Sequence, residues 1–149
     1  MIKSQTVTLI FVLILASTAI AHTGATGIVK ERMDLFKRNQ DNLKAIKGYI
    51  GKKNFEPIIP LASEIRDWAA KMPKYFPAGS NKKPSEASPA IWQNFQDFEK
   101  AARDNELAAS NLINAARSKD INAVMNAFKS VAITCKSCHK SFKIGRAHV

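Results

Sequence analysis

Residues 120–143 read DINAVMNAFKSVAITCKSCHKSFK, and their apolar side chains recur every three or four positions. This spacing predicts a helix with one buried face. Asp120 is a typical N-cap residue, and Gly145 stands just after the expected end of the helix. The buried face is expected to carry Ile121, Val124, Met125, Phe128, Val131, Ala132, Cys135, Cys138, His139 and Phe142.

This segment contains the pentapeptide Cys135-Lys136-Ser137-Cys138-His139, a C-x-x-C-H sequence. It is the sequence at which haem is covalently attached in c-type cytochromes. Each thiol adds to one haem vinyl group, and the two intervening residues let both sulfurs reach. The adjacent imidazole then donates a ring nitrogen to iron. We therefore expect one haem c, held by Cys135 and Cys138 and ligated by His139.

Three other interpretations of the cysteine pair are weaker. A thioredoxin-like redox pair needs a βαβ context, which the sequence does not show. A structural zinc site needs about four ligands, and the other histidines, His22 and His148, stand at the two ends of the chain. A plain disulfide is possible in an exported protein, but it gives His139 no function.

The first residues resemble an export signal. Lys3 supplies a basic start, residues 7–20 are almost entirely apolar, and Ala19-Ile20-Ala21 forms a cleavage site. We expect residues 1–21 to be a signal peptide, residues 22–149 to form one domain, and the protein to be periplasmic. The apolar run is short for a membrane span, which needs about 20 residues. An uncleaved anchor is the alternative, and stable membrane insertion is not expected.

The chain is strongly basic, with 23 Lys and Arg against 12 Asp and Glu, for a formal net charge of +11. Such a surface attracts acidic partners or an anionic membrane face. We expect redox partner proteins with acidic surfaces. No motif for nucleic acid is evident, so nucleic-acid binding is not expected. The alternative is that the lysines only keep helix surfaces soluble.

Three further segments show helical periodicity, at residues 28–49, 57–72 and 88–116. Residues 73–87 are rich in proline, lysine and serine and form the one long connection. Four amphipathic helices with short links predict an all-α fold, an antiparallel four-helix bundle. The inward face of the first segment is expected to carry Ile28, Arg32, Leu35, Phe36, Asn39, Leu43, Ile46 and Ile50.

The sixth ligand of the iron is the main open question. Only ten residues follow His139 and none is methionine, so a methionine ligand would have to come from upstream. Met125 shares a helix with His139, and Met72 is more simply a core residue. Met33 lies one step off the inward face, whereas Phe36 lies on that face and cannot bind iron. We expect five-coordinate iron, with ligation by Met33 as the alternative.

Four stretches together resemble the cytochrome c′ family: VKERMDLF at 29–36, MPKYFPAGS at 72–80, SPAIW at 88–92 and TCKSCHKSFK at 134–143. The resemblance implies a four-helix bundle that often forms homodimers through its first two helices. It places Arg32 near a haem propionate and Phe36 at the position facing the iron. Lys143 stands where many members carry an arginine near the proximal pocket, and Met33 replaces a common glutamine.

These expectations together describe a periplasmic haem protein with high-spin iron that binds nitric oxide or carbon monoxide, with a role in nitric oxide scavenging or tolerance. The alternative is a low-spin electron carrier of the cytochrome c-556 type, with Met33 as the sixth ligand. We do not expect an enzyme, because the sequence places no polar acid–base residue opposite His139.

Overall fold

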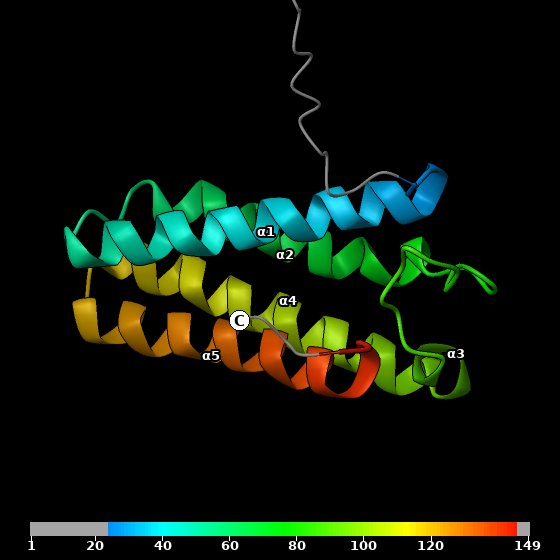
Figure 1. Ribbon diagram of the computed structural model, residues 1–149. Helices are drawn as coiled ribbons and strands as arrows, with labels where there is room; N and C mark the ends of the chain where they lie inside the picture. Colours follow the sequence, from blue (N-terminus) through cyan, green and yellow to red (C-terminus); the bar gives the residue numbers. More distant parts are fainter. Residues whose placement is uncertain (1–23, 146–149) are drawn as a thin grey trace, which may run out of the picture.

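The computed structural model describes residues 24–145, which form an all-α antiparallel four-helix bundle (Figure 1). The expected signal peptide, residues 1–21, and the first residues after it lie outside the described residues. Within residues 24–145, no helix is long and apolar enough to cross a membrane. The helices are α1 Gly27–Gly51, α2 Ile58–Lys71, the 3₁₀ turn η1 Met72–Tyr75, α3 Ala90–Gln93, α4 Phe95–Ser118 and α5 Ile121–Phe142.

The start of α5 confirms the expectation for Asp120. Its side chain accepts hydrogen bonds from the backbone N–H of Asn122 at 2.9 Å and of Ala123 at 3.4 Å. Val124 and Val131 are fully buried, as their spacing predicts. The expectation for Met125 is wrong, because 41% of this residue is exposed. One residue turns a helix by about 100°, so Met125 leaves the face that Val124 occupies.

The segment expected at residues 88–116 is two helices rather than one. The chain leaves the helical conformation at Asn94, with φ −132° and ψ 59°, so that α3 and α4 are separate. The break lets Ile91 enter the core while the Trp92 indole N–H donates to the carbonyls of Phe76 at 3.0 Å and Pro77 at 3.1 Å. Similarly, α2 tightens into η1 at Pro73, which has no backbone N–H to continue an α-helical ladder.

The orientation of α1 also differs from expectation. Asn39 was expected inward but is only half-buried, whereas Asn42 is buried and donates to Glu64 Oε2 at 3.0 Å. Glu64 lies on α2, and α1 packs mainly on α2 rather than on α5. The buried face of α1 is therefore turned toward α2.

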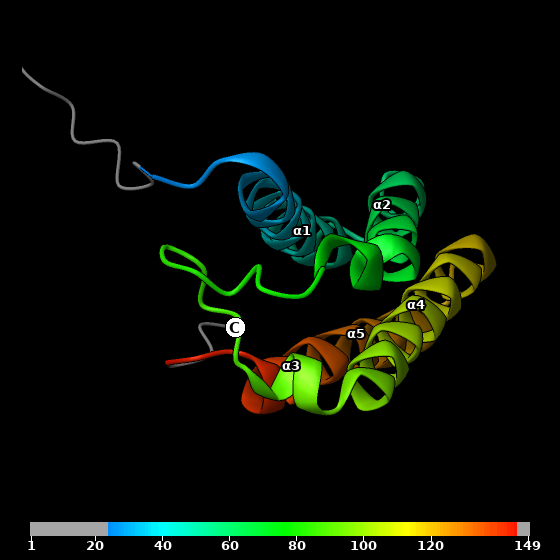
Figure 2. The same cartoon turned by 90° about the vertical axis from the view of Figure 1, so that its right-hand side faces the viewer.

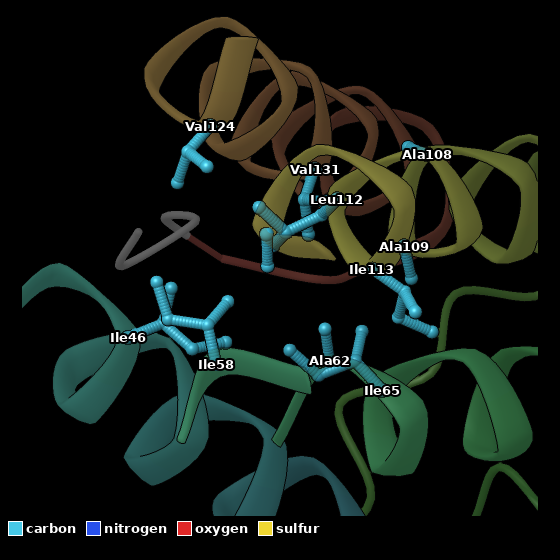
Figure 3. Close-up of a cluster of buried hydrophobic side chains, with 11 residues drawn as sticks. Ile46, Ile58, Ala62, Ile65, Ala108, Ala109, Leu112, Ile113, Val124 and Val131 are labelled. Carbon is cyan, nitrogen blue, oxygen red and sulfur yellow. The ribbon is translucent and has the colours of Figure 1, made fainter. Parts of the chain in front are cut away.

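Two clusters of buried side chains fill the bundle. The aliphatic cluster lies between α2 and α4, with Ile46 of α1 and two valines of α5, and small residues let α2 and α4 approach closely (Figure 3). The aromatic cluster lies toward the other end and includes Trp68, Phe76 and Phe98. The aliphatic cluster comprises Ile46, Ile58, Ala62, Ile65, Ala108, Ala109, Leu112, Ile113, Ala116, Val124 and Val131.

The connection between η1 and α3 crosses the side of the bundle where α1 and α5 face each other (Figure 2). Its last residues pair with the end of α5 through a single antiparallel bridge between Ala87 and Lys143. The backbone N–H of Ser88 donates to the carbonyl of Phe142 at 2.9 Å, and that of Ile144 donates to Glu86 at 2.8 Å. These bonds fix the connection beside the cysteine motif.

Candidate haem site

The two cysteines are half-buried on α5 and lie against different parts of the core. Cys135 packs on the aliphatic cluster and Cys138 on the aromatic cluster. The Sγ atom of Cys135 lies 3.2 Å from Nδ2 of Asn105, which also donates to Thr134 Oγ1 at 3.1 Å. Burial raises the pKa of Cys135, and burial together with Cys135 raises the pKa of Cys138 to about 11. Both thiols are therefore protonated at neutral pH.

His139 follows the second cysteine and faces α1. Its ring lies 6.2 Å from the Phe36 ring, centroid to centroid, at an interplanar angle of 64°. Burial lowers the pKa of His139, Lys143 lowers it further, and Glu86 partly opposes this. The imidazole is therefore neutral at pH 7, which is the form that binds metals. Its Nδ1 atom is buried and has no hydrogen-bond partner among residues 24–145.

Opposite His139 the site is walled by aromatic side chains. Phe36 stands perpendicular to Trp68 at 5.2 Å and contacts Phe76 at 6.4 Å between ring centroids. Phe36 comes from α1, Trp68 from α2 and Phe76 from the connection after η1. These three elements place an apolar surface across from the imidazole.

Arg32 lies one helical turn before Phe36 and is only 2% exposed. Its guanidinium donates to the Tyr75 carbonyl at 3.0 Å, to Ser80 Oγ and Ser85 Oγ at 2.7 Å each, and to the Ser80 carbonyl. It also lies 4.3 Å from the centre of the Phe76 ring. All these partners are neutral, and no carboxylate in the described part of the chain pairs with Arg32. Burial lowers the pKa of Arg32.

Met33 and Lys143 occupy the margins of the site. Met33 is half-buried on α1, and the α1 residues that pack on the aromatic cluster are Leu35 and Phe36. Lys143 follows the end of α5, and its Nζ lies 2.9 Å from Glu86 Oε2. Lys143 is close enough to His139 to lower the pKa of the imidazole.

These features fit a covalently attached haem. The two thiols suit the haem vinyl groups, and the neutral imidazole with its unpartnered buried nitrogen suits the iron. The apolar wall suits the macrocycle, and the buried cation without an acid suits a propionate. When bound, the haem would supply a redox-active iron that can bind small ligands. Cys135 and Cys138 would attach the haem, His139 would ligate its iron, and the aromatic wall would limit which molecules reach it.

The sequence matches the cytochrome c′ family over residues 27–143. The chain belongs to the cytochrome c′ family. It is 32% identical over 124 residues to cytochrome c-556 of Agrobacterium fabrum, covering 80% of this chain and 83% of that protein. It is 35% identical over 83 residues to cytochrome c′ of Rhodospirillum rubrum, covering 55% of this chain and 56% of that protein. That second match spans only about half the length of the Rhodospirillum protein.

The fold agrees with solved structures of cytochromes c′. Cytochrome c′ of Thermochromatium tepidum superposes with a TM-score of 0.73 at 27% identity, covering 79% of this chain and 95% of that chain. Cytochrome c′ of Shewanella frigidimarina gives a TM-score of 0.72 at 26% identity, covering 79% of this chain and 94% of that chain. The four-helix bundle expected from the sequence is confirmed.

Sequence reasoning missed several residues of this cytochrome c′ site. Asn105 is 7% exposed and contacts Cys135, and it continues the inward spacing of Ala102 and Ala109. The periodicity of α4 could therefore have identified it. Ser80 and Ser85, the partners of Arg32, lie in an irregular connection, and no sequence pattern marks them.

Proposed function

We propose that this chain is a periplasmic cytochrome c′ that holds one haem c through Cys135 and Cys138, with His139 as the axial ligand. The iron is five-coordinate and high-spin, and it binds nitric oxide or carbon monoxide. The role is nitric oxide scavenging or tolerance. The observation that carries this proposal is the phenyl ring of Phe36, 6.2 Å from the His139 ring, because a phenyl ring cannot ligate iron.

The aromatic wall supports selectivity for small ligands. Phe36, Trp68 and Phe76 pack on one another, so the iron position opposite His139 is bordered by apolar surface. A diatomic gas needs little room and no strong hydrogen-bond partner. A bulky ligand needs more room, and a charged ligand needs a polar partner. Two solved structures of variants of the Alcaligenes xylosoxidans cytochrome c′, similar in fold to this chain, contain nitric oxide in one and carbon monoxide in the other.

The absorption spectrum of the ferrous holoprotein tests this proposal. A broad high-spin Soret band is expected, and it should sharpen on addition of nitric oxide. Sharp α and β bands without any added ligand would show a six-coordinate iron and overturn the proposal.

A low-spin electron carrier with Met33 as the sixth ligand is the alternative. It is favoured by the relatives that carry the name cytochrome c-556. If the ferrous spectrum is low-spin, Met33→Ala should convert it to high-spin. Met72→Ala serves as a control. Met72 begins η1, is only 6% exposed, and packs in the aromatic cluster.

Electron delivery to the iron is expected through the outer face of α5. Lys129, Lys136 and Lys140 recur there at helical spacing around Ile133, which is 63% exposed. None of these three lysines forms an ion pair within residues 24–145, and residues 121–149 contain no Asp or Glu. By contrast, lysines of other helices pair with an aspartate four residues later, as in Lys30–Asp34, Lys37–Asp41 and Lys100–Asp104.

Because these unpaired lysines lie within the attachment motif and on both sides of it, an acidic redox protein docked there would lie close to the haem. The rate of reduction by reduced flavodoxin, an acidic protein, should fall in Lys136→Glu/Lys140→Glu. The control Lys52→Glu/Lys53→Glu makes the same charge change in the α1–α2 link. Equal rates for both double variants at low salt would contradict docking on α5.

The protein is also proposed to form a homodimer and to lack enzymatic turnover. A solved cytochrome c′ that resembles this chain, with a TM-score of 0.75 at 25% identity, is described as a dimer whose dissociation is controlled by ligand. Sedimentation of the holoprotein with and without carbon monoxide tests the first point. The aromatic surroundings of Phe36 favour the absence of enzymatic turnover, because neither Trp68 nor Phe76 serves as a general acid or base.

A further inference from the structure

Two buried side-chain nitrogens have no hydrogen-bond partner in the part of the chain that the structure describes, His139 Nδ1 and Trp68 Nε1. An unpaired buried N–H is unfavourable, and native proteins rarely retain one without a function. His139 is the proposed iron ligand, so its imidazole already has a place in the haem site. The ring of Trp68 belongs to the apolar wall, but its N–H has no assigned partner, although the residue is only 2% exposed.

The other tryptophan shows that an indole in this bundle ordinarily finds a partner. The Trp92 N–H donates to the carbonyl oxygens of Phe76 at 3.0 Å and Pro77 at 3.1 Å. Trp92 is less buried than Trp68, yet its N–H is satisfied by the chain itself. The unpaired N–H of Trp68 is therefore a local feature and not a general property of the fold.

The position of Trp68 connects it to the haem site. Its ring lies perpendicular to Phe36 at 5.2 Å, and Phe36 in turn contacts His139 at 6.2 Å. Both unpartnered nitrogens therefore belong to rings that contact Phe36. On its other side Trp68 contacts the Tyr75 ring at 5.1 Å, and the Tyr75 carbonyl accepts a hydrogen bond from Arg32. The indole thus contacts both Phe36, which faces His139, and Tyr75, whose carbonyl accepts from the buried guanidinium.

The donors of Arg32 are largely committed to the chain. Its two terminal nitrogens already make four hydrogen bonds, to Tyr75, Ser80 and Ser85. Of its five N–H groups only the one at Nε is left. A carboxylate that neutralises Arg32 therefore needs a second donor for its remaining lone pairs. The strongest acceptors on a haem are its two propionate carboxylates, and Trp68 offers a buried donor that no protein group uses.

We propose that Trp68 Nε1–H donates a hydrogen bond to a haem propionate carboxylate, and so fixes the haem to α2 as the cysteines fix it to α5. This proposal rests on the covalent haem of the proposed function, but not on gas binding. Trp68 is a positioning residue, because it would hold the macrocycle without touching the iron. The competing occupant of the N–H is a gas molecule bound to the iron on the Phe36 side.

Carbon-13 NMR of the holoprotein tests this assignment. Growth on 5-aminolaevulinic acid labelled at its carboxyl carbon leaves label only in the two propionate carboxyl groups of the haem. The ferrous carbon monoxide adduct is diamagnetic, and if the iron is instead six-coordinate, the low-spin ferrous protein is diamagnetic as well. Trp68→Phe keeps an aromatic ring and removes the N–H, and Trp92→Phe is the matched control.

One propionate carboxyl resonance should shift in Trp68→Phe, while the infrared C–O stretch of the carbon monoxide adduct stays where it is. Trp92→Phe should change neither signal. A shifted C–O stretch with unchanged propionate resonances would overturn the proposal in favour of the gas molecule. If neither signal moves in Trp68→Phe, the indole serves neither group and the proposal is wrong.

A second measurement removes dependence on the variant's folding. Wild-type protein labelled with ¹⁵N-tryptophan contains two indole N–H groups, since the chain has two tryptophans. The Trp68 indole proton should show a nuclear Overhauser contact to a propionate methylene of the haem, and its absence would contradict the proposal. A pyridine haemochrome spectrum without covalent haem would instead overturn the proposed function itself, so the two failures are distinguishable.

Discussion

Replacing Arg32 with methionine tests what holds the connection between η1 and α3 against α1. Methionine has a similar length but no charge and no donor. The substitution removes the hydrogen bonds to Tyr75, Ser80 and Ser85, which lie 43, 48 and 53 residues away along the chain. We expect the connection to open locally before the bundle unfolds, because the ties that remain lie at its two ends: the Trp92 bonds to Phe76 and Pro77, and the pairings of residues 86–88 with the end of α5.

The magnitude follows from the number and exposure of the bonds. A hydrogen bond to a charged group contributes roughly 1.5–3 kcal/mol, but Ser80 and Ser85 are half-exposed and water replaces the arginine there. Removing the buried cation also regains part of its desolvation cost, although loss of the proposed propionate partner opposes this gain in the holoprotein. We therefore expect Arg32→Met to destabilise the holoprotein by about 2–3 kcal/mol. Arg32→Lys keeps the charge but not the planar fork, and should lose roughly half as much.

Guanidinium unfolding of the holoprotein, followed by circular dichroism, measures this loss. With a slope of roughly 4 kcal/mol/M for a protein of this size, the midpoint should fall by about 0.5–0.75 M in Arg32→Met. Hydrogen exchange of residues 76–88 should accelerate in the same variant. If Arg32→Lys unfolds like wild type, charge alone accounts for the role of Arg32. If Arg32→Met keeps both its midpoint and its exchange protection, the reasoning is refuted.

Asp120→Ala should destabilise the protein by about 1 kcal/mol through loss of the α5 cap, whereas Asp120→Asn should retain most of the stability that the cap provides. Equal guanidinium unfolding midpoints for the two variants would contradict the capping role. Phe36→Met should produce sharp low-spin bands in the ferrous spectrum and Phe36→Leu should not, whereas a high-spin Phe36→Met would show that this position does not face the iron. In the folded chain before haem attachment, burial and Cys135 raise the pKa of Cys138 to about 11. Its alkylation, followed by mass spectrometry, should therefore accelerate about tenfold per pH unit up to pH 10, and levelling near pH 9 would contradict this.

Helix α5 is the part of the molecule that the sequence predicts best. The apolar spacing, the Asp120 cap and the end of the apolar pattern all lie within the segment itself, and the observed helix Ile121–Phe142 differs little from the expected residues 120–143. The cysteine motif stands on this same segment, so its location was predictable as well. The wrong expectation for Met125 concerned one edge of the buried face, where spacing alone does not define the limit.

The differences elsewhere come from contacts that are distant in sequence. Nothing in the sequence near Asn94 marks a helix break. The break accompanies the hydrogen bonds of the Trp92 indole to the carbonyls of Phe76 and Pro77, about 15 residues earlier. Asn42 rather than Asn39 is buried because its partner, Glu64, lies on α2. The burial of Arg32 was predictable from spacing, but its neutral partners were not, since they lie in an irregular connection.

The two sides of the candidate site are carried by different pairs of helices. Phe36 lies on α1, which packs mainly on α2, and His139 lies on α5, which packs mainly on α4. The pairs are joined chiefly where α2 meets α4, through small residues such as Ala62 and Ala109. The separation between Phe36 and His139 therefore depends on how closely α2 approaches α4. Close packing transmits volume changes at such a contact to its surroundings, so the aliphatic cluster, which meets the site only at Cys135, also sets the distance between Phe36 and His139.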